Sequence, residues 1–361
     1  MKQEMAHPQN IDPTRPFAWG IVGTGVIARQ FAADLRHVDG ARIGAVCSRS
    51  EKAARDFMAA IGAAGFYPTL AALLADDRID AVYLATPNVL HAPQALEALR
   101  AGKPVLVEKP LATSSGDAAR IADLAGTNRC FAMEALWTRF LPAVQAVHDM
   151  LAAGAIGEVT HIEAELAYRK QETTGDRFFD PALGGGSALD LGVYPLSLAV
   201  HLLGTPEKFS GRWWAARSGV DRRCRFELSF ANATATLSCG FDRDGANSFS
   251  IFGERGAIRS EAPFLKAQRI TLFERGTGGL PLVGARGPTS GLAGKLLSRL
   301  PLPGRKASHF RFPGNGLQFE AAAVMEAVRM GAAQSSVMPL RESIAVLEVI
   351  ETVLGQPAER G

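Results

Sequence analysis

The amino-acid sequence predicts a two-domain α/β protein, and three observations lead to that prediction. The chain has 361 residues, which is more than a single hydrophobic core usually supports. From Phe17 to about Phe140, short apolar strands alternate with Ala-rich helical stretches, which is typical of a parallel sheet built from βαβ units. After about Pro142, alternation of single apolar and polar residues replaces that rhythm and indicates half-buried antiparallel strands.

The first domain is expected to span residues 17–140, after a disordered N-terminal extension of residues 1–16. The helical stretches between its strands, such as Lys52–Ile61 and Ala92–Ala101, are long enough to return the chain for another parallel strand. The strands are expected at Phe17–Val22, Ala41–Cys47, Ala81–Ala85, Pro104–Glu108 and Cys130–Glu134.

The second domain, residues 141–361, is expected to hold a large, mostly antiparallel open sheet with one covered face. Apolar and polar residues alternate over 161–166, 223–230 and 233–239, and further strands fit Ser248–Phe252 and Arg269–Phe273. Two helices, Leu317–Met330 and Leu340–Leu354, close the chain. A sheet with one uncovered face also predicts a homodimer that forms through that face.

Residues 275–316 are rich in Gly, Pro and basic side chains and contain no acid. Long Gly- and Pro-rich segments are usually solvated loops, and we expect a loop here. The basic side chains leave a second interpretation open, in which the segment forms a lid over an anionic cofactor.

Composition excludes several classes of function. The formal net charge is only +3, and no Lys/Arg block alternates with aromatic residues, so nucleic acid is not an expected partner. The four cysteines are scattered without a C-x-x-C pair, which argues against a metal site and predicts reduced thiols in the core. We expect a soluble, cytoplasmic protein, because neither a signal peptide nor a run of about 18 apolar residues is recognisable.

A glycine-rich turn at the end of the first strand predicts a Rossmann dinucleotide-binding domain. Gly23 permits the tight turn, Gly25 lets the backbone approach a pyrophosphate, and Ala28 allows close packing of the following helix. The strand before and the helix after supply the context that the motif G-x-G-x-x-A needs. A purely structural turn is the alternative. The expected cofactor contacts are Gly23, Thr24, Gly25, Val26, Ile27 and Ala28.

The end of the second strand favours NADP over NAD. An acidic residue there would hold the ribose hydroxyls of NAD, but the sequence reads Cys47-Ser48-Arg49-Ser50. A guanidinium suits the 2′-phosphate of NADP, so Ser48 and Arg49 are expected to bind it. In the alternative, Arg49 caps a surface loop and Glu51 reaches the ribose.

Four further runs resemble the family that groups glucose-fructose oxidoreductase, inositol dehydrogenase and their relatives, the Gfo/Idh/MocA family. The resemblance extends over nearly the whole chain after Phe17. Two runs, 133–140 and 184–195, resemble its branch of dimeric dihydrodiol dehydrogenases and NADP-dependent D-xylose dehydrogenases. The other two, Ala85-Thr-Pro-Asn-Val-Leu-His91 and Val107-Glu-Lys-Pro110, imply cofactor contacts at Thr86, Pro87, Asn88, His91, Glu108 and Lys109.

The resemblance also directs attention to Lys109, Asp190 and Tyr194 as catalytic residues. A hydroxyl proton must leave as hydride departs, and a tyrosine accepts it only if its pKa, near 10 when unperturbed, is lowered. Lys109 follows a parallel strand, where open α/β sheets bind ligands, and its ammonium is expected to lower that pKa. Asp190 is expected to orient the substrate. In the alternatives Lys109 is a surface lysine, Tyr194 a core tyrosine and Asp190 a helix cap.

These residues together predict an NADP-dependent oxidoreductase that acts on the CH–OH group of a small sugar, such as the aldose xylose, or of a trans-diol. A non-catalytic NADP-binding regulator of the same fold is the alternative, and retention of a proton-transfer pair argues against it. The candidate substrate contacts are Trp137, Arg139, Phe140, Arg177, Phe178 and Asp190. In the alternative, the aromatic side chains of this set are plain core residues.

Overall fold

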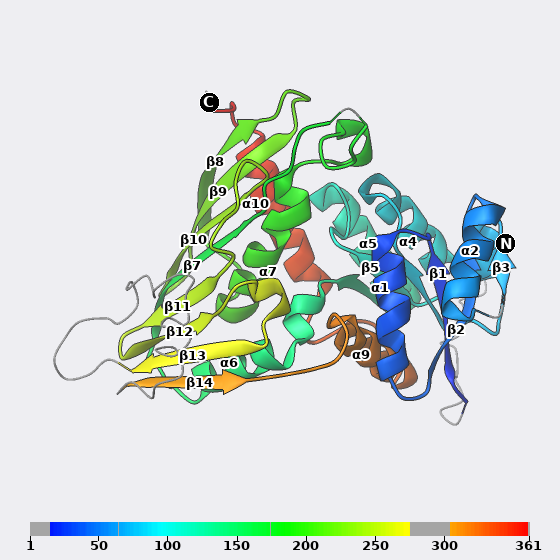
Figure 1. Cartoon of the computed structure of the whole chain (residues 1–361), viewed down its shortest axis with the longest axis horizontal. Coiled ribbons are helices and arrows are strands. Elements are labelled where there is room, and N and C mark those ends of the chain that lie inside the picture. Colours follow the sequence, from blue (N-terminus) through cyan, green and yellow to red (C-terminus); the bar gives the residue numbers. More distant parts are fainter. Residues whose placement is uncertain (1–14, 64, 174, 275–303, 360–361) are drawn as a thin grey trace, which may run out of the picture.

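The computed structural model describes residues 15–63, 65–173, 175–274 and 304–359. Two sheets organise these residues (Figure 1): a parallel sheet flanked by helices, and a broad sheet with helices on one face. The predicted fold class, a Rossmann sheet followed by a mostly antiparallel open sheet, is confirmed.

The Rossmann sheet has six parallel strands in the order β3-β2-β1-β4-β5-β6. Its central strands are entirely buried, and Phe31 of the first helix stacks on Tyr83 at 3.9 Å between ring centroids. Its strands are β1 (Phe17–Val22), β2 (Ala41–Cys47), β3 (Phe66–Tyr67), β4 (Ala81–Leu84), β5 (Val105–Glu108) and β6 (Ala132–Ala135). Its helices are α1 (Val26–Asp34), α2 (Glu51–Ile61), α3 (Leu70–Leu74), α4 (His91–Arg100) and α5 (Ser115–Asn128).

The second sheet has eight strands in the order β14-β13-β12-β11-β7-β10-β9-β8. Strands β7 and β10 pair in parallel, so the expectation that every alternating strand is antiparallel is wrong at this pair. The strands are β7 (Val159–Ala167), β8 (Lys208–Ala215), β9 (Asp221–Ser229), β10 (Thr234–Gly240), β11 (Phe249–Gly253), β12 (Gly256–Ser260), β13 (Arg269–Glu274) and β14 (Arg305–His309).

Helices cover one face of this sheet (Figure 1): α6 packs on β13, α7 on β7 and β10, and α10 on β8. The apolar positions of the strands, such as Ile162, Ala164 and Leu166, are buried under them. The remaining helices are α6 (Pro142–Ala152), α7 (Val193–Leu203), α9 (Leu317–Arg329) and α10 (Leu340–Leu354), with short turns η1 (Leu35–His37), η2 (Asn88–Leu90), η3 (Trp137–Phe140), η4 (Pro181–Leu183), η5 (Ala188–Gly192) and η6 (Phe264–Lys266).

The two closing helices return to the Rossmann sheet: α9 packs on α1 and α10 packs on α5. One buried carboxylate fixes this return. Asp34, at the end of α1, accepts hydrogen bonds from the backbone amides of Asn315 (2.8 Å), Gly316 (3.0 Å) and Leu317 (3.1 Å). Gly316 cannot cap α9 with a side chain, so Asp34 satisfies the first amides of that helix from another part of the chain.

Several expectations need correction. Arg15 was expected in a disordered extension, but its guanidinium forms an ion pair with Asp80, and Asp80 also accepts a hydrogen bond from the amide of Ala18 at 2.7 Å. Residues 1–14 of the expected extension lie outside the described residues. Of the segment 275–316, residues 305–309 form the edge strand β14 rather than a loop, because they pair with β13. Residues 275–303 lie outside the described part of the chain.

One stretch, Pro181–Leu203, is apolar and long enough to cross a membrane by length and composition alone. It consists of η4, η5 and α7, and 78% of its most apolar window is buried inside the protein. We therefore interpret it as the core helix of the second domain. The four cysteines are free thiols and all are buried, as expected.

Replacing Asp34 by Ala is expected to lower the free energy of unfolding by about 2–3 kcal/mol, because several backbone amides lose a charged, buried acceptor. Urea unfolding followed by circular dichroism measures this change. Asp39→Ala removes an exposed carboxylate a few residues further on and is expected to change stability by less than about 0.5 kcal/mol. A loss in Asp34→Ala no larger than in this control would contradict the anchoring role.

Candidate active site

Lys109 and Asp190 form an ion pair between the two sheets. Lys109 directly follows β5, and Asp190 lies in η5. The Nζ of Lys109 donates to Oδ1 of Asp190 at 3.0 Å and to the backbone oxygen of Asp190 at 2.7 Å, and each side chain is 15% exposed. With this small remaining exposure the pair is mostly buried between the two domains.

The segment that carries Asp190 is held by a second buried carboxylate. Asp221 accepts hydrogen bonds from the hydroxyl of Ser187 and the amide of Ala188, both at 2.7 Å. Gly186 has φ +122°, and a Cβ there would lie 2.2 Å from Oδ1 of Asp221, so only glycine lets the chain pass this closely. The turn η5 that follows is a π-helix, a form that is frequent at functional sites.

Tyr194 lies in the first turn of α7 and is 7% exposed. Its hydroxyl accepts a hydrogen bond from the indole Nε1 of Trp137 at 3.2 Å, and the Nζ of Lys109 lies 5.1 Å from its ring centroid. The structure therefore brings together the three predicted catalytic residues and one predicted substrate contact.

The pKa of Tyr194 is set by two opposing effects. Burial raises it and the charge of Lys109 lowers it, and the net pKa is about 12. The expectation that Lys109 brings the pKa of Tyr194 below 10 is wrong. The charge of Lys109 does lower this pKa, but burial raises it by more.

The ion pair keeps both partners charged. Burial acts against the charge of Lys109, but Asp190 outweighs it and raises the lysine pKa. Burial likewise favours the neutral acid at Asp190, but Lys109 lowers its pKa on balance. The site thus contains a fixed ammonium beside a protonated phenol.

Glu108 and His91, two of the predicted cofactor contacts, are buried and have hydrogen-bond partners within the protein. Glu108 is buried, accepts from the hydroxyl of Tyr83 and, at 3.1 Å, from the amide of Lys109, and burial raises its pKa to about 7. His91 is buried with Nδ1 2.7 Å from the carbonyl of Pro110 and Nε2 2.8 Å from that of Thr86. Its ring therefore joins the loops after β4 and β5.

The glycine-rich turn fits a dinucleotide. Gly23 has φ +105°, and a Cβ there would lie 2.5 Å from the carbonyl of Ala85. A Cβ on Gly25 would meet nothing within 4 Å, so open space lies beside the amino terminus of α1. Val26, at 75% exposure, is an apolar side chain that a ligand on this turn would cover. Thr24 lies in this turn, Ile27 and Ala28 lie in the first turn of α1, and Ala28 is buried.

The predicted 2′-phosphate contact also fits. Arg49 is exposed and makes no hydrogen bond or ion pair with another described residue. Ser48 accepts from the amide of Ser50 at 3.2 Å, and Ser50 caps α2. Glu51 is turned toward Arg55, whose guanidinium lies 2.5 Å away, so the alternative in which Glu51 reaches a ribose loses support.

Three other predicted cofactor contacts, Thr86, Pro87 and Asn88, follow β4, and one of them reaches the second domain. The amide of Asn88 donates to the backbone oxygen of Gly184 at 2.9 Å, which ties the loop after β4 to the second domain. The hydroxyl of Thr86 donates a hydrogen bond to the side-chain oxygen of Gln94 at 2.7 Å. Pro87, the next residue in the chain, is exposed.

The structure gives Arg139 a role unlike the predicted substrate contact. Its side chain is 1% exposed, and each guanidinium nitrogen is bonded to protein: to Ser197 at 2.7 and 2.8 Å, to Val337 at 3.0 Å and to Glu342 at 2.5 Å. Arg139 therefore joins η3, α7 and α10 beneath the site. Phe140 is half-buried against the core and plays a similar packing role.

Phe178 and Arg177, by contrast, lie on the loop that approaches the site, with the guanidinium carbon of Arg177 4.1 Å from the Phe178 ring centroid. Sequence reasoning missed two lysines nearby. Lys170 follows β7, and a basic residue close to the end of a strand could have indicated a ligand contact. Lys266, whose Nζ lies 5.4 Å from the Trp137 ring, is isolated in sequence and gave none.

No group of three or more His, Cys, Asp or Glu residues that could hold a metal ion occurs among the residues that the structure describes. The titratable side chains that meet at this site include those of Lys109, Asp190 and Tyr194. A phenol beside a fixed ammonium can give a proton to, or take one from, an oxygen of a bound molecule.

Two family descriptions match the chain. Residues 17–135 match the "Oxidoreductase family, NAD-binding Rossmann fold" of GFO/IDH/MocA, and residues 144–259 match the "GFO/IDH/MocA C-terminal domain". The D-xylose 1-dehydrogenase (NADP(+)) of Hypocrea jecorina is 30% identical, over 94% of this chain and 91% of its own length. The trans-1,2-dihydrobenzene-1,2-diol dehydrogenase of Bos taurus is 29% identical, over 93% and 95%.

Among solved structures, a 3-ketoreductase from Actinomadura kijaniata in complex with NADP and TDP-benzene superposes with a TM-score of 0.78. It is 26% identical, and the match covers 94% of this chain and 97% of that one. The fold, the dinucleotide turn and these matches together define an oxidoreductase. The chain belongs to the GFO/IDH/MocA family of oxidoreductases, and the predicted resemblance is confirmed.

Replacing Arg49 by Ala is expected to weaken NADP binding by about 1–3 kcal/mol, the scale of a lost charge-assisted hydrogen bond, and to leave NAD binding nearly unchanged. Calorimetric titration of both cofactors measures the difference. Arg55→Ala, which removes an exposed arginine of α2 paired with Glu51, should leave both affinities unchanged. Equal losses for NADP and NAD in Arg49→Ala would show that this guanidinium does not select the cofactor.

Proposed function

We propose that this protein is an NADP-dependent dehydrogenase that oxidises the CH–OH group of a small sugar or trans-diol, or carries out the reverse reduction. The observation that carries the proposal is the contact between Lys109 and Asp190 beside Tyr194, next to a dinucleotide turn. NADP, when bound, accepts or supplies the hydride. A regulator that only senses NADP would need the turn and Arg49 but no buried ion pair beside a phenol.

Tyr194 is proposed to exchange the proton of the reacting oxygen. With a pKa of about 12 it is protonated at neutral pH, the state needed to protonate a carbonyl during reduction. Oxidation needs the ionised phenol, and the ammonium of Lys109 stabilises that charge. Asp190 keeps Lys109 charged and in place, and its outer carboxylate oxygen is available to a substrate hydroxyl.

NADP as the cofactor is supported by the unpaired Arg49 and by two relatives, a xylose dehydrogenase named for NADP(+) and a ketoreductase solved with NADP. The substrate class is supported by the same comparison, because the curated relatives act, by their names, on D-xylose and on a trans-diol. Trp137 and Phe178 offer aromatic walls that suit either ligand.

We further propose that the boundary between the domains lies at residues 140/141, within the gap between the two matched regions, and that the protein is cytoplasmic. Four buried free thiols are suited to a reducing compartment.

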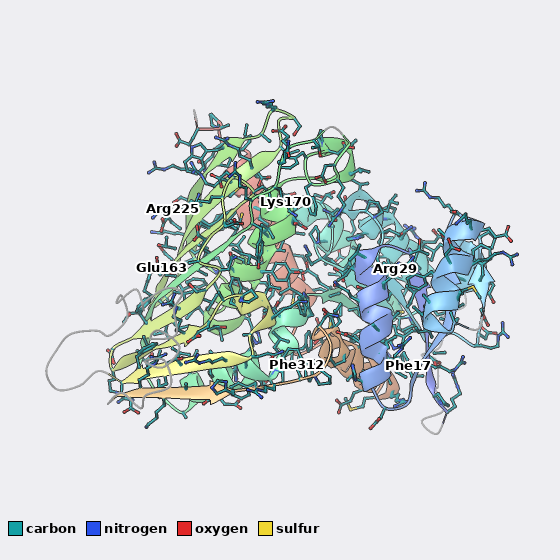
Figure 2. All side chains as sticks on the ribbon, in the orientation of Figure 1. Phe17, Arg29, Glu163, Lys170, Arg225 and Phe312 are labelled. Carbon is teal, nitrogen blue, oxygen red and sulfur yellow. The ribbon has the colours of Figure 1, made fainter. Side chains whose placement is uncertain are left out.

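The uncovered face of the second sheet is the proposed homodimer interface. Figure 2 shows Glu163 and Arg225 on this outer face, away from the helices. A hollow of about 560 Å³ lies there, with Trp214, Phe252 and several arginines in its lining. It lies on the side of the sheet opposite Tyr194, so we assign it to subunit contact and not to catalysis.

Replacing Tyr194 by Phe is expected to lower the turnover number by about 10²–10⁴-fold, the usual contribution of a general acid/base, while NADP affinity barely changes. Steady-state kinetics with D-xylose and a trans-diol measure it. Tyr67→Phe, in β3, removes a distant phenolic hydroxyl as the control. Near-full activity at saturating substrate, with an intact circular dichroism spectrum, would assign the proton transfer to another group.

The same tyrosine predicts the pH profile. Only the ionised phenol accepts a proton, so the oxidation rate should still be rising at pH 10, below the pKa of about 12. Lys109→Met should move this rise to higher pH as well as slow the reaction, because an effect that lowers the pKa is lost. The double variant should lose less than the product of the single losses. A plateau below pH 9 would contradict the assignment.

Sedimentation at micromolar concentration is expected to give about twice the 38.3 kDa chain mass. Trp214→Lys, which adds a positive charge beside Arg223 and the other arginines of the hollow, should shift the protein toward monomer, because like charges held together in an interface repel each other. Lys52→Glu, on the exposed surface of α2, should not. A wild-type protein that sediments as a monomer would rule out this interface.

A further inference from the structure

Two cations stack on one phenyl ring beside the proposed active site. The Nζ of Lys170 lies 3.6 Å from the ring centroid of Phe178 and 5.6 Å from that of Phe241. The guanidinium carbon of Arg177 lies 4.1 Å from the Phe178 centroid. The electron-rich faces of these rings attract cations, so both charges are held in position before any ligand arrives.

Neither cation is neutralised by a carboxylate in the part of the chain that the structure describes: Lys170 and Arg177 form no ion pair there. The acids on the same stretch are directed at backbone amides instead. These hydrogen bonds run to Asp176 from Phe178 (3.1 Å), to Asp180 from Ala182 (2.9 Å), and to Glu172 from Arg217 and Ser218 (3.1 and 2.9 Å).

The pair lies close to the reacting groups. The carbonyl of Phe178 accepts from the amide of Gly186 at 2.9 Å, four residues before Asp190. Figure 2 shows Lys170 on the inner side of the open sheet, toward the Rossmann domain. Both cations also act on Asp190, whose pKa they help to lower after Lys109.

The two cations are not paired with the acid of the site. Asp190 is already paired with Lys109, so Lys170 and Arg177 are two further positive charges that have no carboxylate in ion-pair contact among the described residues. Lys266, on the Trp137 side, adds a third cation, because within the described part of the chain its Nζ donates to the neutral amide oxygen of Asn315 at 2.9 Å and forms no ion pair. Like charges held near one ring repel each other, and an anion placed between them relieves that repulsion.

We infer that the substrate carries an anionic group, a phosphate or a carboxylate, and that Lys170 and Arg177 bind it. This inference rests on the proposed function, because it names the class of sugar on which the same site acts. A neutral aldose or diol would leave these cations without a partner. An anionic sugar would place its charged end on the Lys170 side and its reacting CH–OH group near Tyr194 and Lys109.

The test compares matched sugars with and without the anion: D-glucose 6-phosphate and D-glucuronate, each against D-glucose, with NADP and the full chain. The ratio of kcat/KM for the anionic sugar to that for glucose is expected to exceed about tenfold for one anion, and the two arms show whether phosphate or carboxylate is preferred. Lys170→Gln and Arg177→Gln should each reduce this ratio about 10- to 100-fold. Lys208→Gln, exposed on β8, makes the same charge change and should keep it.

Three results would overturn the inference. One is a wild-type ratio at or below one for both anions, and another is a ratio that both glutamine variants retain. The third is a pair of variants that weaken NADP binding and leave the ratio unchanged, since the cations would then serve the cofactor.

Calorimetric binding of glucose 6-phosphate to the NADP complex separates this inference from the proposed function. Turnover without an anion preference would leave the proposed function intact and refute the subsite. If glucose 6-phosphate binds saturably, this binding is lost in Lys170→Gln and no sugar or diol is turned over, the result would support the subsite and refute the dehydrogenase.

Discussion

The buried ion pair of Lys109 and Asp190 is the interaction on which the site depends, because Lys109 follows β5 of the Rossmann sheet and Asp190 lies in η5, which packs on the second sheet. Removing one partner of such a pair leaves an uncompensated charge and typically costs about 3–5 kcal/mol. The pair therefore fixes the position of η5 relative to the carboxyl end of β5 while it sets the charge beside Tyr194. One contact thus links domain arrangement and proton chemistry.

Other buried polar groups support this contact from both sides. Asp221 holds the start of η5 in the second domain, and His91 joins the loops after β4 and β5 in the first. Glu108 bonds the amide of Lys109 and so orients the residue whose ammonium meets Asp190. Each of these groups is buried with hydrogen-bond partners on the protein, and each positions a backbone segment of the site.

Local patterns were sufficient to predict most of the fold. The strands of the first sheet have unbroken apolar runs, and Leu340–Leu354 has a regular helical period that the structure reproduces to the residue. The parallel pairing of β7 with β10 was not predictable, since alternation reports burial of a face and says nothing about the neighbour's direction. In the site, motif residues such as Gly23 and Lys109 were identifiable. The burial of Arg139 and the position of Lys170 depend on tertiary contacts distant in sequence.

The hydrogen bonds from Asn315, Gly316 and Leu317 to Asp34 have a consequence for the order in which the chain becomes native. These contacts join residues 281 to 283 positions apart. The carboxylate of Asp34, at the end of α1, therefore gains these hydrogen bonds only after residues 315–317 have been synthesised. On a ribosome, the amino-terminal sheet emerges long before α9 and α10 can cover it, and its helices stay partly uncovered in the meantime. A nascent chain released before α9 and α10 are made would expose that apolar surface, so these two helices complete a domain whose strands are synthesised much earlier.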